Sequence, residues 1–502
     1  MSKRIADSEN GNAPLKGGDR PDPMDVDDKD MGEFEDEFED EFESEEEFIE
    51  AGVDGRPDAE REAEERAMND AMDVEQNNGT FIVGRNKLEA GQHLAPDLGT
   101  YEILHSLSTP WPCLSFDIVR DGLGDNREKA YPATMYTVAG TQAESKREKE
   151  NQIMVMKFSG LSRMQKEDDG SDSEDDDDDD EEADPILESK SIPLTSTTNR
   201  IRAHQTPSQD ASDPPTTITA TMTESSNIFI HDITPHLSSF DNPGTIITPQ
   251  QNKPLSTIRA HKTEGYALDW SPLVPEGKLL TGDNDGLIYV TSRNSGGGWV
   301  TDTRAFQGHT SSVEEIQWSP SEASVFASAS SDGTVRVWDV RSKSRKPAIT
   351  VQASSVDVNV MSWSRLTTHL LATGADDGVW GVWDLRQWKG GAGEKPTPIA
   401  SFAYHQEQIT SIEWHPTDDS MVAVAAGDHK VTLWDLSVEL DDEESKDTAG
   451  VKDMPPQLLF EHISEHAKEV HWHPQIPGTL VATGQEFSVF RPIPVVYGIH
   501  GK

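Results

Sequence analysis

The 502-residue chain has little cysteine, little positive charge and no long apolar run. Its one cysteine, Cys113, cannot form an intrachain disulfide, which excludes a disulfide-stabilised secreted protein and indicates a reducing compartment. No stretch approaches the roughly 18 apolar residues that a membrane-spanning helix needs. The polar start Met-Ser-Lys-Arg has none of the apolar character of a signal peptide. We therefore expect a soluble intracellular protein.

The excess of negative charge is concentrated in three acidic segments. There are 43 Lys and Arg against 92 Asp and Glu, a formal net charge of −49. Residues 22–75 contain 26 acids and 4 bases, residues 167–184 contain 14 acids and no base, and residues 439–447 contain 6 acids and one Lys. Together these segments account for 41 of the 49 charges. Such blocks stay solvated and attract basic partners, so we expect a Lys- and Arg-rich partner, no direct nucleic-acid binding and no membrane binding.

The first 100 residues predict an acidic, disordered tail over residues 1–80 and a lead-in segment over residues 81–100, because the tail has few aliphatic residues and dense negative charge. Within the tail, Phe34, Phe38 and Phe42 recur every four residues. That spacing would place the three rings near one face of a helix once cations neutralise the neighbouring acids. They are candidate apolar contacts for a partner. The alternative is a solvated spacer.

A repeat begins after residue 100. A Trp followed by Ser or His-Pro recurs at intervals of 45–58 residues, at Trp270, Trp318, Trp363, Trp414 and Trp472. Four short strands per repeat of this length are typical of a β-propeller blade of the WD40 type. The sequence therefore predicts an all-β fold, a seven-bladed WD40 β-propeller over residues 101–497, with acidic loop insertions at 162–190 and 439–456. We expect the strand Tyr101–Ser106 to complete the last blade and close the ring.

Repeated polar residues predict hydrogen-bonded chains inside the blades rather than catalytic groups. In WD repeats a His, a strand Ser or Thr, a turn Asp and a Trp indole form such a chain, which is stable when fully satisfied. The candidates in blades 4 to 6 are His309, Ser328, Asp332, Trp338, Thr373, Asp377, Trp383, His405, Asp428 and Trp434. Two other blades and one position of blade 6 depart from the pattern, and the residues concerned are His204 in blade 2, His261, Thr281, Asp285 and Thr291 in blade 3, and Val424 in blade 6. We expect Val424, which stands at the hydroxyl position, to shorten the chain in blade 6.

The repeats and the segment YEILHSLSTPWPCLSFDIV (101–119) resemble the retinoblastoma-associated histone-binding WD proteins. The acid-rich N-terminus, FIVGRNKLEAGQ (81–92) and the poly-Asp insertion make the chain most similar to the glutamate-rich WD-repeat family, whose fungal members are ribosome-assembly proteins.

This resemblance implies a non-enzymatic chaperone without a cofactor. Its client would be a newly made, basic large-subunit ribosomal protein, the third in the standard numbering. The chaperone would act as a monomer in the nucleus and nucleolus, with some cytoplasmic pool, and would meet pre-ribosomal particles indirectly. Two alternatives remain, a histone-binding chromatin chaperone and a substrate receptor of a cullin-type ubiquitin ligase.

The candidate client-binding residues lie mainly in the two insertions. The acids of this predicted clamp are Asp175, Asp176, Asp177, Asp178, Asp179, Asp180, Glu181, Glu182, Asp441, Asp442, Glu443 and Glu444. Candidate apolar contacts follow the second insertion at Pro455, Pro456, Leu458 and Phe460. In the histone-binding relatives the matching loop walls a groove for a basic helix. The alternative is a tolerated surface insertion.

Three further motifs carry weaker hypotheses. Ser171 and Ser173 each precede an acid by three residues and are candidate phosphorylation sites, since phosphate would add negative charge. Trp338-Asp339-Val340-Arg341 and Trp383-Asp384-Leu385-Arg386 match the WD-x-Arg box of ligase receptors, a short motif that recurs by chance. The histidines at 462, 466, 471 and 473 lack metal-site spacing, and the repeat explains His462 and His473, so we expect no metal site.

Overall fold

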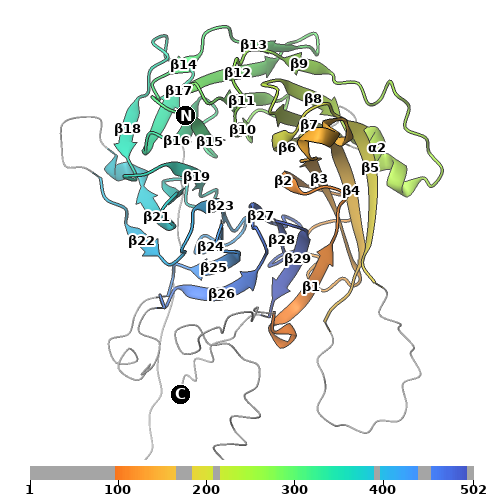
Figure 1. The fold of residues 1–502 in the computed structure, drawn as a ribbon. Helices are drawn as coiled ribbons and strands as arrows, with labels where there is room; N and C mark the ends of the chain where they lie inside the picture. The colour runs from red at the N-terminus through yellow and green to blue at the C-terminus, as the bar shows by residue number, and fades with distance from the viewer. Residues whose placement is uncertain (1–95, 165–183, 207–214, 389–395, 439–453, 494–502) are drawn as a thin grey trace, which may run out of the picture. The chain divides into compact units, whose positions relative to one another are not determined.

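Seven antiparallel sheets arranged around a central axis form the folded part of the chain in the computed structural model (Figure 1). The structure describes residues 96–164, 184–206, 215–388, 396–438 and 454–493, all within one compact unit, residues 79–502. The all-β class and the seven-bladed propeller are thereby confirmed. The acidic tail and most of both acidic insertions lie outside the described residues. None of the described helices combines the length and apolar character needed to cross a membrane.

We call the strands of each blade a to d, from the centre outward. Blade 1 consists of β2 (Cys113–Val119), β3 (Ala133–Thr141), β4 (Gln152–Leu161) and β5 (Ile186–Pro193). Blade 2 consists of β6 (Thr198–Thr206), β7 (Thr216–Thr223), β8 (Ile228–Asp232) and β9 (Ser256–Ile258). Blade 3 consists of β10 (Ala267–Trp270), β11 (Lys278–Gly282), β12 (Leu287–Arg293) and a split outer strand, β13 (Trp299–Thr301) and β14 (Phe306–Gln307).

The remaining blades follow the same order. Blade 4 consists of β15 (Val313–Trp318), β16 (Val325–Ser330), β17 (Thr334–Asp339) and β18 (Ile349–Gln352). Blade 5 consists of β19 (Val358–Trp363), β20 (Leu370–Ala375), β21 (Val379–Asp384) and β22 (Ala400–Ala403). Blade 6 consists of β23 (Ile409–Trp414), β24 (Met421–Ala426), β25 (Lys430–Asp435) and β26 (Leu458–Ile463). Blade 7 consists of β27 (Glu469–Trp472), β28 (Leu480–Thr483), β29 (Phe487–Pro492) and β1 (Tyr101–Leu107).

The ring closes as the sequence predicts, because β1 pairs antiparallel with β29, nearly 400 residues later in the chain. Joining the two ends of the propeller in one sheet leaves no free edge at the junction. The short helices lie in connections, and they are η1 (Leu98–Thr100), η2 (Ser145–Glu150), α2 (Thr234–Asp241) and η3 (Leu385–Gln387).

The core lies between neighbouring blades. The b strands are almost wholly buried, as in β24, where Val422, Ala423 and Val424 are inaccessible to solvent. Such continuous apolar runs fit strands that are covered on both faces by adjacent sheets. Each repeated Trp ends an a strand, for example Trp318 in β15 and Trp414 in β23. The Trp spacing in the sequence therefore marks the inner wall of the ring.

The hydrogen-bonded chain expected in blade 4 is present. His309 Nε2 lies 2.7 Å from Ser328 Oγ, its Nδ1 lies 3.0 Å from Asp332 Oδ2, and the Trp338 indole donates to Ser328 Oγ at 2.8 Å. In blade 5, whose sequence pattern includes no such His, the Trp383 indole donates to Thr373 Oγ1 at 2.8 Å. Asp377 there is exposed and accepts from the Val379 amide in the turn.

Blade 6 corrects one expectation. His405 Nδ1 contacts Asp428 at 3.1 Å, and its Nε2 lies 3.0 Å from Thr432 Oγ1, which also accepts from the Trp434 indole at 2.8 Å. A hydroxyl on the c strand thus replaces the one that Val424 lacks on the b strand, and the chain is complete rather than short. The prediction failed because it considered only one strand position.

Three further expectations were wrong in detail. In blade 3 the partner of His261 is Asp283, at 2.7 Å, and not Asp285, because the acceptor lies at the end of strand b rather than in the turn. His204 lies within strand β6, stacked on Trp270, and does not open blade 2. The loop expected over 162–190 ends earlier, because β5 begins at Ile186 and pairs with β4.

The connections define two faces. In an antiparallel meander the a–b and c–d connections lie on one face and the b–c and d–a connections on the other. We call the first the insertion face. Residues 165–183 connect β4 to β5 and residues 439–453 connect β25 to β26, so both acidic insertions are c–d connections joined to the insertion face. Blade 7 alone separates the two blades that carry them.

Candidate functional site

The residue before each repeated Trp points toward the axis of the ring, and together with its counterparts in blades 1 and 2 it forms a polar layer. We call these positions the acceptor layer, which consists of Asp117, Arg202, Asp269, Gln317, Ser362, Glu413 and His471. Sequence reasoning missed this layer as a unit. The signal was available, since five of the seven residues immediately precede the Trp of the repeat.

Most members of the layer accept a hydrogen bond from the backbone of the next blade. Asp269 accepts from the Trp318 amide at 2.7 Å, and Gln317 accepts from the Trp363 amide at 2.8 Å. Asp117 accepts in the same way from the Ala203 amide at 2.8 Å. Satisfying these buried amides holds adjacent blades in register.

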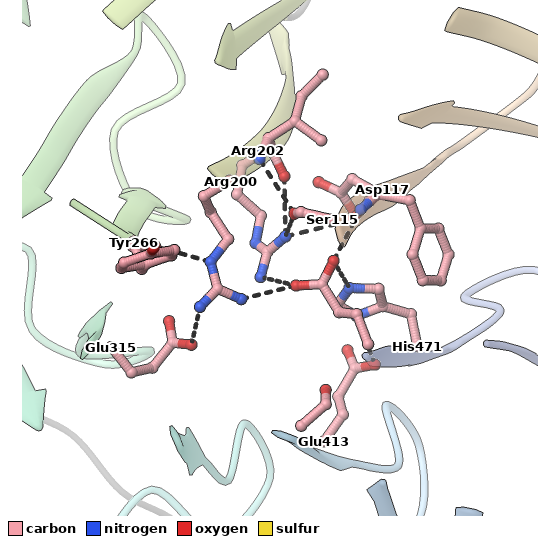
Figure 2. Close-up of polar contacts among 12 residues, drawn as sticks. Ser115, Asp117, Arg200, Arg202, Tyr266, Glu315, Glu413 and His471 are labelled. Atoms are coloured by element: carbon pink, nitrogen blue, oxygen red, sulfur yellow. Dashed lines mark hydrogen bonds and ion pairs between the residues drawn. The ribbon is translucent and has the colours of Figure 1, made fainter. Parts of the chain in front are cut away.

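A second layer lies two residues closer to the start of each a strand. Its ion pairs join different blades across the centre of the ring (Figure 2). Arg200 contacts Glu469 at 2.8 Å and Glu315 at 3.2 Å, and Arg202 of the acceptor layer reaches the same Glu469 at 2.7 Å. Glu469 also accepts from the Phe116 amide at 2.7 Å. The Glu469 carboxylate therefore joins blades 1, 2 and 7.

His471 is positively charged in this environment. Burial by itself would lower the pKa of His471, but Glu413 at 3.0 Å and Glu469 at 3.6 Å raise it to about 10. The pKa of Glu469 lies well below its usual value, because Arg202, His471 and Arg200 outweigh the effect of burial. Buried charges of this kind are stable only when paired.

Asp117 and Asp269 differ from the other acids of the site. Burial raises the pKa of Asp269 to about 7 and also raises the pKa values of Asp117 and Glu315, but Glu315 is paired with Arg200. Among the described residues neither Asp117 nor Asp269 has a cation within 4 Å. More distant cations oppose the effect of burial, namely Arg202 on both, His471 on Asp117 and Arg365 on Asp269.

These residues line a cavity of about 460 Å³ on the axis of the ring. Its wall runs from Arg200, Glu315 and Glu469 to the acceptor layer, and then to Pro272, Pro416 and Pro474, which follow their a strands. The cavity extends beyond the ends of the a strands into the a–b connections. It therefore lies on the insertion face.

The predicted client-binding residues are placed only in part. Outside the described residues lie Phe34, Phe38, Phe42, Ser171, Ser173, residues 175–182 and residues 441–444. Pro455 and Pro456 precede β26, which contains Leu458 and Phe460. Both of these apolar side chains are half-buried against the blade cores, and the Phe460 ring packs edge-on against Tyr101 at 5.1 Å.

The two WD-x-Arg boxes have the same local geometry. Arg341 pairs with Asp339 at 2.7 Å, and Arg386 pairs with Asp384 at 2.8 Å. Both arginine side chains are largely exposed, and exposed pairs contribute little to stability. Each guanidinium thus contacts the acid of its own box.

The histidines near the C-terminus have separate contacts. His462 bridges Tyr101 and Ser488 at 3.0 and 2.9 Å, and His473 Nδ1 accepts from the amides of Gln475 and Ile476. No group of three or more His, Cys, Asp or Glu side chains that could hold a metal ion occurs among the residues that the structure describes.

Comparisons with known proteins give consistent matches. Residues 91–162 match the family of "Histone-binding protein RBBP4" and its counterpart in the CAF1 complex, and residues 301–339 and 396–435 match "WD domain, G-beta repeat". The chain is 46% identical to "Ribosome assembly protein rrb1" of Schizosaccharomyces pombe over 85% of its own length and 88% of that protein.

Two other relatives have similar coverage. "Protein HEAT STRESS TOLERANT DWD 1" of Arabidopsis thaliana is 42% identical over 82% of the chain and 90% of the relative. "Glutamate-rich WD repeat-containing protein 1" of Dictyostelium discoideum is 42% identical over 81% of the chain and 83% of the relative.

Proposed function

The chain belongs to the glutamate-rich WD-repeat family, and on that basis we propose that it is a non-enzymatic chaperone in ribosome assembly. In this proposal it binds a newly made, basic large-subunit ribosomal protein, the third in the standard numbering, and delivers it to pre-ribosomal particles. The name of the fission yeast relative supports the process. The inference that the client is basic rests on the negative charge of this chain.

The observation that carries the proposal is the distribution of acid. Three segments hold 41 of the 49 net negative charges, and two of these segments are c–d connections joined to the insertion face. Ribosomal proteins carry Lys- and Arg-rich extensions that contact RNA phosphates. Carboxylate-rich segments offer such extensions a similar negative field, and their attraction falls as salt screens it. Two tracts tethered to one ring also raise the effective concentration of acid around a bound client.

Release follows from the same electrostatics. Ribosomal RNA carries a denser array of negative charge than a carboxylate segment and gains counterion release on binding. A client handed to a pre-ribosomal particle would therefore exchange one polyanion for a stronger one. This exchange needs no bond-breaking chemistry. In this proposal the protein acts in the nucleus and nucleolus, and a cytoplasmic pool meets the client where it is made.

A histone-binding role is the second candidate. It is favoured by the match of residues 91–162 to the histone-binding family, since histone tails are also rich in Lys and Arg. Both candidates need the same acid on this chain, and they differ only in the partner. Charge alone therefore does not discriminate between them.

The test is capture of partners from native nuclear extract on the full-length chain, followed by quantitative mass spectrometry. We expect one free large-subunit ribosomal protein in stoichiometric amount, released by raising the salt concentration. A variant with residues 175–180 changed from Asp to Asn serves as the electrostatic control. Core histones as the main stoichiometric partner would overturn the proposal in favour of the second candidate. A ubiquitin-ligase adaptor, retained at high salt, would overturn both.

A further inference from the structure

Two carboxylates in the central cavity carry a charge that the fold does not require. Asp117 and Asp269 each link their blade to the next through one backbone hydrogen bond. At equivalent positions Gln317 and Ser362 make the same link with a neutral oxygen, at 2.8 and 3.3 Å. A neutral acceptor is therefore sufficient to hold adjacent blades. The negative charge at Asp117 and Asp269 needs another explanation.

That charge is costly where it stands. A half-buried carboxylate loses hydration, and a nearby cation is the usual compensation. Glu413, at the equivalent position in blade 6, has this compensation from His471. Asp117 and Asp269 have no cation within 4 Å among the described residues and face the cavity.

One hydroxyl in the cavity wall has no hydrogen-bond partner among the described residues. Ser271, which is only 1% exposed, lines the cavity, and its hydroxyl makes no hydrogen bond among the residues described. The hydroxyls of the equivalent Ser319 and Ser364 accept hydrogen bonds from backbone amides of their own a–b connections. Ser271 thus lacks the contact that its counterparts make.

The charge balance of the wall favours a cation. The two layers contribute the carboxylates of Asp117, Asp269, Glu315, Glu413 and Glu469 against the cations Arg200, Arg202 and His471. Two more arginines stand in the a–b connections. Arg120 pairs with Asp125 at 2.6 Å, whereas Arg365 is exposed and acts on Asp269. With Arg120 offset by Asp125, the five acids face four cations, which leaves one negative charge.

The entrance to the cavity is mixed, because Arg120 and Arg365 stand near three exposed leucines, which we call the rim leucines. Leu123, Leu273 and Leu366 are exposed in the a–b connections of blades 1, 3 and 5, which immediately follow the strands that form the wall. Exposed apolar residues beside a polar site can contribute to a partner-binding surface. The cavity of about 460 Å³ has room for a long side chain and several waters, each of which takes about 30 Å³.

We propose that the insertion face is the client-binding face, and that one Lys or Arg side chain of a basic partner segment enters the central cavity between Asp117 and Asp269. Apolar residues of the same segment would contact the rim leucines. The identification of the partner as a ribosomal protein rests on the proposed function, whereas the cavity and its preference for a cation do not. The acidic insertions would hold the rest of the basic client beside this face.

The test uses the full-length chain and a short labelled peptide of Lys, Arg and Leu, with binding measured by fluorescence anisotropy at physiological ionic strength. The Asp117→Asn, Asp269→Asn double variant keeps both inter-blade acceptors and removes two charges. The matched control is the Glu407→Gln, Glu465→Gln double variant, which removes two exposed charges from d–a connections on the opposite face. We expect the first pair to weaken binding about tenfold or more relative to the control.

The matched control separates the cavity from the general attraction of the acidic segments, which both variants retain. Equal affinities of the two double variants would overturn the proposal. A second comparison does not involve charge: Leu366→Ser should weaken binding, whereas Val356→Ser, an exposed apolar change on the opposite face, should not. If native extract yields a ribosomal protein on both double variants equally, the proposed function stands and the cavity site is wrong. If the peptide discriminates between the variants but histones are captured, the reverse holds.

Discussion

Asp269 and Gln317 occupy equivalent positions in neighbouring blades and accept the same kind of hydrogen bond, yet only one is charged. At the scale of single residues this comparison separates what holds the ring together from what the ring can bind. The hydrogen bond is a structural requirement that any oxygen meets. A charge kept at a cost to folding is typical of functional sites.

The first prediction concerns the stability of Asp269→Asn as a function of pH. Burial raises the pKa of Asp269 to about 7, above the ordinary Asp value near 3.9, so its contribution to stability is present at pH 4 and is lost as the pH rises through 7. Asn carries no charge at any pH. Relative to the wild type, the variant should therefore gain about 2–3 kcal/mol of stability between pH 5 and pH 8. Thermal unfolding at both pH values measures this, and a variant equally destabilised at both would contradict it.

The second prediction concerns His471→Gln. This change leaves Glu413 and Glu469 without the cation that they share, and breaking a buried pair in this way costs about 3 kcal/mol. Since Glu413 and Glu469 raise the pKa of His471 to about 10 against the effect of burial, its contribution is complete below pH 6.5 and is lost as the pH rises through 10. The difference between variant and wild type should therefore be large at pH 7 and smaller at pH 9.5.

His415→Gln is the matched control for that measurement. His415 is also half-buried and packs against Trp472, at 4.5 Å between rings, but makes no ion pair within the described residues. Its replacement should cost less, and the cost should not change above pH 7. Equal behaviour of the two histidine variants would contradict the role given to the His471 ion pairs.

At the scale of strands and blades, the sequence predicted the features that recur from repeat to repeat. It missed the case in which one strand supplies a side chain that another strand lacks. The repeated Trp, which ends the a strands of blades 3 to 7, located these five blades. The closure of β1 on β29 followed from the position of a strand before the first repeat. Blade 6 was misjudged because Thr432 supplies from a neighbouring strand the hydroxyl missing at Val424, and strand-to-strand substitution leaves no pattern along the chain.

The central cavity was beyond sequence reasoning for the same physical reason. Glu469 contacts Arg200 and Arg202, although about 270 residues separate it from them in the sequence. Only closure of the ring brings these residues together. The acidic insertions were evident from composition. Their attachment to one face became clear only once each was assigned to a c–d connection.

The third prediction belongs to the polar chain of blade 6. Thr432→Val removes the hydroxyl that contacts both His405 and the Trp434 indole, so two buried groups lose a partner and stability should fall by about 2–3 kcal/mol. Val424→Thr, which restores the usual hydroxyl position, should give no gain because Thr432 already occupies both contacts. Urea unfolding of the two variants provides the comparison. A stabilised Val424→Thr variant would contradict this description of blade 6.

At the scale of the whole molecule, the ring supplies a fixed site and the acidic segments supply a broad negative field. The two contributions should respond differently to salt, because attraction between solvated charges is screened over about 8–10 Å at physiological ionic strength whereas contacts inside a cavity are screened much less. A basic client should therefore show a steep salt dependence at low ionic strength and a residual, salt-resistant affinity at higher ionic strength.

The fourth prediction separates the acidic segments by their attachment to the ring. Changing the six residues 175–180 from Asp to Asn removes six charges from a segment tethered between β4 and β5. The matched variant replaces the six acids among residues 33–40 with their amides and removes equal charge from the N-terminal tail. If the client lies on the insertion face, the first variant should lose more affinity at low salt, by several-fold, and the two should converge at high salt. Both should keep the thermal unfolding midpoint of the wild type, and equal losses at every salt concentration would mean that only total charge matters.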